Sequence, residues 1–217
     1  MRDKRSEWNA VRSLLKSSTP PFSLLVESVC EPFVSIRDSR IQTADEVITK
    51  LADKISTVSS SVRVSVDFGN LTLVHSDRVI AEMLGTLSER LGDSARSVVP
   101  VIRTDSAPEL LRAALFWTRT YGTGLSVRAL GLTKLDQASR VVQDILGEMN
   151  LSPEQIDFIT DAQDLPRIVT HSEMRAAFPL TANARSWTHL AGSFPGGITH
   201  LNADDYEHTL ERSEWSV

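Results

Sequence analysis

Short apolar runs alternate along the chain with longer stretches in which apolar positions recur every three or four residues. Val47, Ile48, Leu51 and Ile55 share one face at helical spacing, whereas residues 62–67 carry β-branched side chains at alternate positions. This alternation repeats and predicts the two kinds of element in turn. The predicted strands cover residues 22–27, 62–67, 98–103, 125–129, 156–161 and 187–193, and the predicted helices cover residues 4–16, 44–58, 76–91, 107–121 and 133–149.

Proline and polar residues mark several of the predicted boundaries. Thr19-Pro20-Pro21 ends the first helix, because proline lacks an amide donor and restricts the residue before it. Ser76-Asp77 suits an N-cap followed by a negative charge in the first helical turn. Pro108 suits the first turn of the next helix.

Repeated strand–helix units, about 25 to 40 residues apart, predict a parallel sheet that is either closed into a barrel or open and doubly wound. An open sheet usually shows a glycine-rich turn after its first strand, and none is present here. Charged residues instead recur where the predicted strands end, at the edge where a (β/α)₈ barrel builds its active site. These residues are Glu27, Asp67, Arg103, Arg128 and Asp161. The sequence therefore favours the α/β class and a TIM-like (β/α) barrel with a mostly parallel sheet.

Composition narrows the class of protein. A length of 217 residues predicts a single domain over residues 1–217. A net charge of −5 and a pI near 5.6 make nucleic-acid binding by bulk electrostatics unlikely. Cys30 is the only cysteine, which excludes an internal disulfide framework and a cysteine-rich zinc site. Neither a secretory signal nor a membrane-spanning run is visible, so we expect a cytoplasmic protein with no membrane partner.

Several common chemistries lack their sequence signatures. The five histidines show no metal-ligand spacing, and no GxSxG elbow, P-loop or GxGxxG motif is present. Hydrolase, NTPase and dinucleotide-binding functions are therefore disfavoured, and the sequence points to no particular metal or cofactor.

Several segments taken together resemble the beta-protein family, which takes its name from a bacteriophage protein and occurs in phages and bacteria. The segments are Lys4-Arg5-Ser6-Glu7, Leu24-Leu25-Val26-Glu27, Val64-Ser65-Val66-Asp67, Val99-Pro100-Val101-Ile102-Arg103, Leu125-Ser126-Val127-Arg128, Asp157-Phe158-Ile159-Thr160-Asp161, Ala191-Gly192-Ser193-Phe194-Pro195 and Arg212-Ser213-Glu214-Trp215. The last two are the most specific. The resemblance spans nearly the whole chain and implies a TIM-barrel-like domain, but it implies little about activity.

The chain departs from the family pattern at both ends. Family members place a short apolar strand before the first of these segments, and they continue past the tryptophan into a helix and a strand with an aspartate-tyrosine-glycine motif. Neither is present here, so the resemblance implies an incomplete barrel of about six strands, without the family's first and last strands. Open sheet edges invite another strand, so we expect another protein chain or self-association to cover them. The alternatives are a shortened relative without the family's activity and a truncated gene product.

The charged strand ends form the candidate site. Glu27, Asp67 and Asp161 are candidate catalytic residues that can move protons or bind a hard cation. Arg103 and Arg128 carry planar, permanently charged groups suited to phosphate or carboxylate. Further candidate ligand-binding residues are Lys4, Arg5 and Glu7 beside the rim, Ser193 and Phe194 after the last predicted strand, and Arg212. The competing interpretation is a network of ion pairs that closes the barrel without any ligand.

Two functions from different classes remain open. The first is a phage- or defence-associated interaction module that recognises a protein or a small anionic ligand. The second is an enzyme for a phosphate-bearing substrate, in which Arg103 and Arg128 hold the anion while Asp67 or Glu27 moves a proton. An incomplete barrel favours the first, because catalysis needs its groups held to about 0.5 Å.

Overall fold

The computed structural model of the 217-residue chain describes residues 5–17, 23–27, 43–69, 71, 75–130, 144, 147, 151–161 and 184–190. These residues fall into two compact units, Met1–Ser126 and Val127–Val217. The strand β4 (Leu125–Leu130) runs across the boundary between them. The two units are described separately below.

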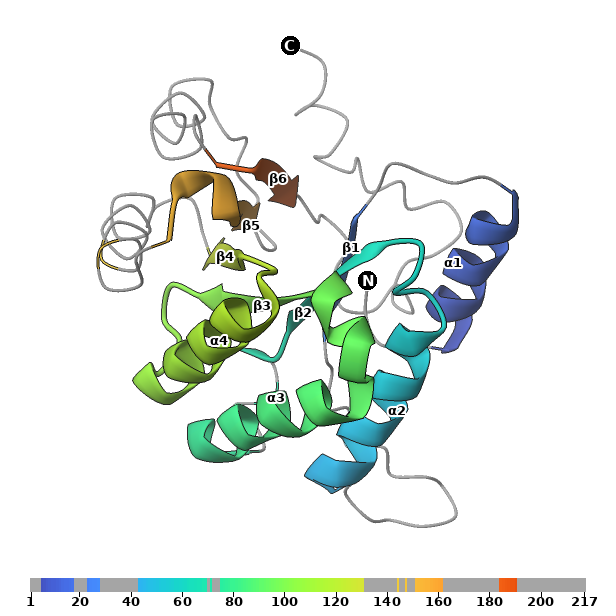
Figure 1. The fold of residues 1–217 in the computed structure, drawn as a ribbon, viewed down its shortest axis with the longest axis horizontal. Helices are drawn as coiled ribbons and strands as arrows, with labels where there is room; N and C mark the ends of the chain where they lie inside the picture. Colours follow the sequence, from blue (N-terminus) through green and yellow to red (C-terminus); the bar gives the residue numbers. More distant parts are fainter. Residues whose placement is uncertain are drawn as a thin grey trace, which may run out of the picture. The chain divides into compact units, whose positions relative to one another are not determined.

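The first unit repeats a strand followed by a helix, after an initial helix (Figure 1). Its elements are α1 (Arg5–Ser17), β1 (Ser23–Glu27), α2 (Ala44–Ser56), β2 (Arg63–Asp67), α3 (Asp77–Leu91), the 3-10 helix η2 (Gly92–Ser97), β3 (Val98–Arg103) and α4 (Pro108–Tyr121). Strands β1 and β2 pair in parallel, with Ser23 opposite Arg63 and Glu27 opposite Asp67. Strand β3 continues the parallel sheet, with Val64 opposite Val98.

Local signals explain where the helices begin and end. Thr43 caps α2, because its hydroxyl accepts a hydrogen bond from the Glu46 amide while the Glu46 carboxylate accepts one from the Thr43 amide. Pro108 opens α4, where its missing amide hydrogen costs nothing. Gly122 ends α4 in the left-handed conformation with φ of 68°, which only glycine adopts without strain.

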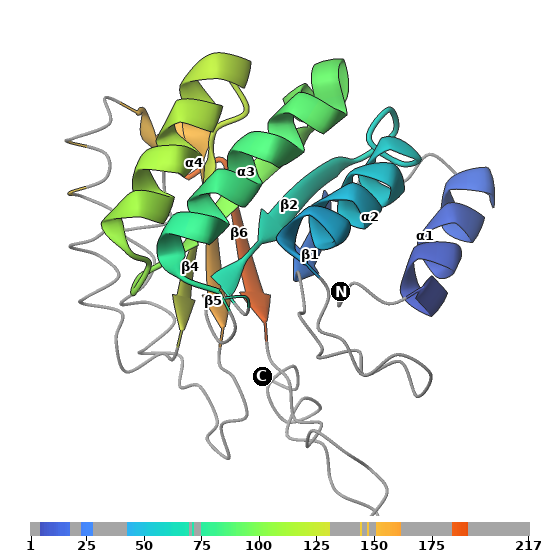
Figure 2. The ribbon, with the colours of Figure 1, turned by 90° about the horizontal axis from the view of Figure 1, so that it is seen from below.

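The core of the first unit lies between the sheet and its helices. Helices α2, α3 and α4 lie on one side of β1 and β2 (Figure 2). Alternation along a strand places Val64 and Val66 on one face and Arg63, Ser65 and Asp67 on the other. Both valines are fully buried, and the apolar stripes of the helices supply their partners. The buried apolar residues of α2 are Val47, Ile48, Leu51, Ala52 and Ile55.

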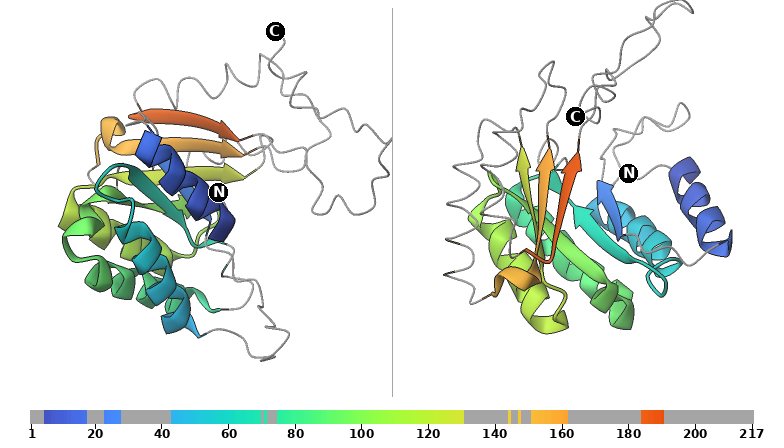
Figure 3. Two further views of the ribbon diagram at one scale, coloured as in Figure 1. Left: turned by 90° about the vertical axis from the view of Figure 1, so that its right-hand side faces the viewer. Right: turned by 90° about the horizontal axis from the view of Figure 1, so that it is seen from above.

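The second unit contains β5 (Ile156–Asp161), preceded by the short 3-10 helix η4 (Pro153–Gln155), and β6 (Ser186–Leu190). The two strands pair in parallel, with Asp157 opposite Ser186 and Asp161 opposite Leu190 (Figure 3). Arg185 binds the Asp157 carboxylate, to which the Ser186 hydroxyl also donates at 2.7 Å. This contact ties the beginnings of the two strands together.

The order of the described strands identifies the fold class. Strands β1 to β6 neighbour one another in the sheet in the order in which they follow in the chain. A doubly wound sheet reverses direction at a switch point, whereas a β/α barrel adds each strand beside the previous one. The fold is therefore α/β and compatible with an incomplete β/α barrel of six strands, which confirms the expected class.

Most predicted elements are confirmed to within two residues. Strands β3 and β5 match their predicted bounds, and β6 begins one residue earlier than predicted. The end of that predicted strand, residues 191–193, lies outside the described residues. So does the predicted helix over residues 133–149, apart from Asp144 and Gly147, which are helical. Among the described residues, no helix has the length and apolar character needed to cross a bilayer.

Candidate functional site

The carboxyl ends of β2 and β3 carry a buried ion pair between Asp67 and Arg103. The Asp67 carboxylate accepts hydrogen bonds from Arg103 Nε, at 3.1 Å to each oxygen, and Arg103 Nη2 lies 3.1 Å from Oδ2. The Gly69 amide donates a further bond to Asp67 Oδ1 at 2.7 Å. The Asp67 side chain is fully buried, whereas that of Arg103 is 14% exposed. The guanidinium is thus held by a carboxylate that water does not reach.

The turns after the two strands shape this ion pair. A side chain at Gly69 would place its Cβ only 2.0 Å from Arg103 Nε, so only glycine leaves room for the guanidinium. The Ser106 hydroxyl accepts a hydrogen bond from the Arg103 amide at 2.8 Å, and the Ser106 amide donates to the Arg103 carbonyl at 2.9 Å. These local bonds end β3 at Arg103 and direct the chain into the turn before α4.

The second unit repeats this arrangement with the residue types exchanged. Arg128 lies near the carboxyl end of β4 and Asp161 at that of β5. Arg128 Nε donates to Asp161 Oδ2 at 2.9 Å, and its Nη2 donates to the same oxygen. The side chains are 8% and 10% exposed. In each unit, therefore, an arginine at a strand end binds an aspartate at the end of another strand.

Glu27 lies beside the first ion pair. It occupies the last position of β1, directly opposite Asp67 in the parallel register, so the two side chains leave the sheet on the same face. Glu27 is half-buried. The first unit thus brings together three of the predicted residues, Glu27, Asp67 and Arg103.

The remaining predicted residues are less well described. Arg5 and Glu7 lie on α1, but their side chains are outside the description. Lys4, Ser193, Phe194 and Arg212 lie outside the described residues. Their place in the candidate site therefore stays a prediction.

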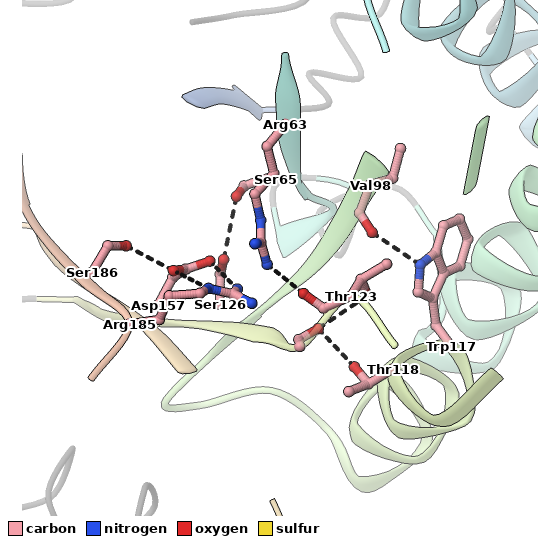
Figure 4. A network of polar contacts seen from close by, with 11 residues as sticks. Arg63, Ser65, Val98, Trp117, Thr118, Thr123, Ser126, Asp157, Arg185 and Ser186 are labelled. Atoms are coloured by element: carbon pink, nitrogen blue, oxygen red, sulfur yellow. Dashed lines mark hydrogen bonds and ion pairs between the residues drawn. The ribbon is translucent and has the colours of Figure 1, made fainter. Parts of the chain in front are cut away.

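A polar layer under the first ion pair was missed by the sequence analysis. The hydroxyls of Ser65 in β2 and Ser126 in β4 lie 3.2 Å apart and are buried, and Figure 4 shows them pointing toward each other. Alternation places Ser65 on the same face as Asp67. The signal was present in Val64-Ser65-Val66-Asp67 and in Leu125-Ser126-Val127-Arg128, in both of which a serine precedes the charged residue by two positions.

The connection after β2 also holds a histidine that the analysis of strand ends missed. The Leu71 amide bonds the Phe68 carbonyl, and the His75 amide bonds the Leu71 carbonyl at 2.8 Å. The Nε2 atom of His75 is buried and has no hydrogen-bond partner among the residues described. A buried polar atom without a partner costs about 1–3 kcal/mol.

In the first unit, the Asp67–Arg103 ion pair places opposite charges together at the carboxyl ends of β2 and β3. Asp67 accepts hydrogen bonds from the Gly69 amide and from Arg103 Nε, and the bonds from Arg103 orient its side chain. Among the described residues, no three acidic, histidine or cysteine side chains gather closely enough to hold a metal ion. Hydrogen bonds from the Ser152 side chain and from its own backbone amide lower the pKa of exposed Glu154. Glu154 lies on η4, before β5 rather than at its carboxyl end.

Arginines fixed at the carboxyl ends of parallel strands suit the recognition of anionic groups, because the guanidinium offers several donors in one plane. Searches of curated proteins and of solved structures give no match to this chain. The family model described as Beta protein matches residues 6–217, which is nearly the whole chain. The chain therefore belongs to the Beta protein family.

Proposed function

We propose that this chain is a binding module that recognises an anionic group, a phosphate or a carboxylate, at the carboxyl ends of its strands. The observation that carries the proposal is the Arg103 guanidinium, held by buried Asp67 yet still partly exposed. A charged pair withdrawn from water stabilises a fold little or not at all compared with apolar residues. A role in ligand recognition gives a reason for its presence at this edge.

The surroundings of Arg103 favour binding over catalysis. Asp67 fixes the guanidinium before a ligand arrives, so less side-chain entropy is lost when the ligand binds. The same contacts make Asp67 a positioning residue, because its carboxylate holds the Arg103 guanidinium in place. Arg128 is held in the same way by Asp161 in the second unit.

Titration calorimetry with inorganic phosphate and with succinate tests the proposal. Arg103→Lys keeps the charge but loses the planar pair of donors, and we expect it to weaken binding about tenfold. Arg112→Ala is the matched control, because Arg112 is an exposed arginine of α4 whose ion pair with Glu109 lies at the surface. Equal affinities of wild type and Arg103→Lys, or no binding of either anion by the wild type, would contradict the proposal.

An enzyme acting on a phosphate-bearing substrate is the second candidate. Glu27 supports it, because this half-buried carboxylate lies opposite Asp67 and on the same face. In this mechanism Arg103 holds the phosphate and Glu27 moves the proton. Release of phosphate from p-nitrophenyl phosphate tests it. Turnover that Glu27→Gln abolishes, with phosphate affinity unchanged, would favour the enzyme over the binding module.

Association with another chain is a separate part of the proposal. Strands β1 and β6 stand at the two ends of the described strand order, and the end of a strand order is where a strand from another chain can extend a sheet. Native mass spectrometry tests this idea directly. A mass that is a multiple of 24.0 kDa, or a bound second protein, would support it, whereas a bare 24.0 kDa species would contradict it.

A further inference from the structure

The amino ends of the strands in the first unit border an open hollow of about 380 Å³. Ser60, Ser61 and Arg63 reach it from the segment that enters β2, and Arg96 and Ser97 from the segment that enters β3. Asp67 and Arg103 end those same strands. The hollow is therefore distinct from the candidate site, because it lies at the opposite edge of the sheet.

Charge and hydroxyl groups give the hollow its character. Two of its nine lining residues are arginines, four are serines, and none is acidic. Arg96 lies in the last turn of the 3-10 helix η2, where it is exposed and forms no ion pair with any residue that the structure describes. Its positive charge is therefore available at the hollow.

The fold positions the second arginine across the hollow. The Arg63 guanidinium donates to the Thr123 carbonyl, as Figure 4 shows, and so links the start of β2 to the residues before β4. The turn after α2 is closed by a hydrogen bond from the Ser61 amide to the Val58 carbonyl at 2.9 Å. This turn leaves Ser60 and Ser61 exposed at the border of the hollow.

The C-terminal ends of the helices at this edge repel an anion, but this repulsion is weak. Helices α2 and α4 end near the hollow, and the end of a helix carries about half a negative charge. Carbonyls there already accept hydrogen bonds, since Ile55 accepts from Ser59 and Thr118 accepts from Gly122. Two whole positive charges outweigh these partial charges at close range.

We propose that this hollow binds the phosphate group of a small phosphate monoester, with Arg96 as the principal cation and Arg63 and the serine hydroxyls as further donors. Arginine is the side chain best matched to phosphate, and serine hydroxyls complete the donor set without adding a competing charge. The volume lies within the range of small-molecule sites, so there is space for an organic group besides the phosphate.

Titration calorimetry with glycerol 3-phosphate and the full chain tests this site. Arg96→Ala is the informative variant, because an exposed side chain can be removed without disturbing the core. We expect its affinity at this site to fall at least about tenfold, the usual effect of losing a charge-assisted hydrogen bond. Arg78→Ala is the control, because Arg78 is an exposed arginine of α3 that pairs with Glu82 and does not line the hollow.

Combining variants separates this site from the one at the carboxyl ends. If both sites bind phosphate esters, Arg96→Ala and Arg103→Lys each weaken one of two binding events, and the double variant weakens both. The proposal is overturned if Arg96→Ala binds glycerol 3-phosphate with unchanged affinity. It is also overturned if the wild type shows a single binding event that depends on Arg103 alone. Binding lost equally in Arg78→Ala also overturns it, because the effect would then be one of net charge.

Discussion

The two faces of β2 and β3 differ in chemistry although the same short strands build both. One face carries Val64, Val66 and Ile102, which are buried and apolar. The other carries Ser65 and Asp67 from β2 and Arg103 at the end of β3, beside the buried Val99 and Val101. Burial of apolar side chains stabilises a fold without any need for hydrogen-bond partners. Burial of a polar group costs free energy unless the group finds a partner. The first face therefore stabilises the fold by apolar burial, and the second carries the polar groups to which we assign the proposed binding function.

The largest expected effect on stability comes from removing one partner of the Asp67–Arg103 ion pair on the polar face. Asp67→Ala leaves the Arg103 guanidinium, only 14% exposed, without its carboxylate, and we expect a loss of about 3–5 kcal/mol in the free energy of unfolding. Urea unfolding followed by circular dichroism measures this loss.

The matched control replaces both partners of that ion pair. Asp67→Leu with Arg103→Met removes the two charges together, so most of the stability should return while anion binding stays lost. A single variant Asp67→Ala that loses less than about 1 kcal/mol would show that the pair is better solvated than its burial implies.

A core substitution on the other face comes next. Ile102→Ala in β3 removes a side chain that is 1% exposed, and we expect a loss of about 2–5 kcal/mol, since it leaves a cavity beneath the helices. Phosphate binding per folded molecule should not change. Leu14→Ala on α1 is the control, because Leu14 is 52% exposed and its removal should change stability by less than about 0.5 kcal/mol.

Two glycine substitutions are expected to change the stability of the fold in opposite directions. Gly69→Ala forces the Arg103 guanidinium away from its place, and we expect a loss of about 1–3 kcal/mol together with weaker anion binding. Gly85→Ala in α3 meets nothing within 4 Å and should gain about 0.5–1 kcal/mol, because alanine favours the helix. Thermal unfolding of both variants in parallel decides the matter, and equal shifts would refute the close approach at Gly69.

The smallest effect concerns the two hydroxyls. Ser65→Ala leaves the buried Ser126 hydroxyl without this contact, and we expect a loss of about 1 kcal/mol. Ser65→Ala with Ser126→Ala should cost less than the sum of the two single variants, because no orphaned hydroxyl remains. A double-mutant cycle in urea measures this coupling, and strict additivity would show that the hydroxyls do not interact.

Much of the fold was predictable because its signals are local. The bounds of β3 and β5 follow from apolar runs that end in Arg103 and Asp161. The gathering of Asp67 and Arg103 at the carboxyl ends of their strands was also predictable, because parallel strands bring those ends together at one edge. The pairing was not predictable in the same way. Nothing in the sequence shows that Asp67 binds Arg103, or that Arg128 binds Asp161, since each partner lies more than thirty residues away.

The sequence by itself determined the order of elements, the apolar face of each helix and strand, and the row of charges at the strand ends, because these depend on periodicity and on neighbours along the chain. Only the tertiary structure decided which charges neutralise each other, that Gly69 lies against a guanidinium, and that a serine-lined hollow with two arginines opens at the other edge. Those features arise where segments distant in sequence meet, and there distance and burial, rather than residue type, set the strength of a contact.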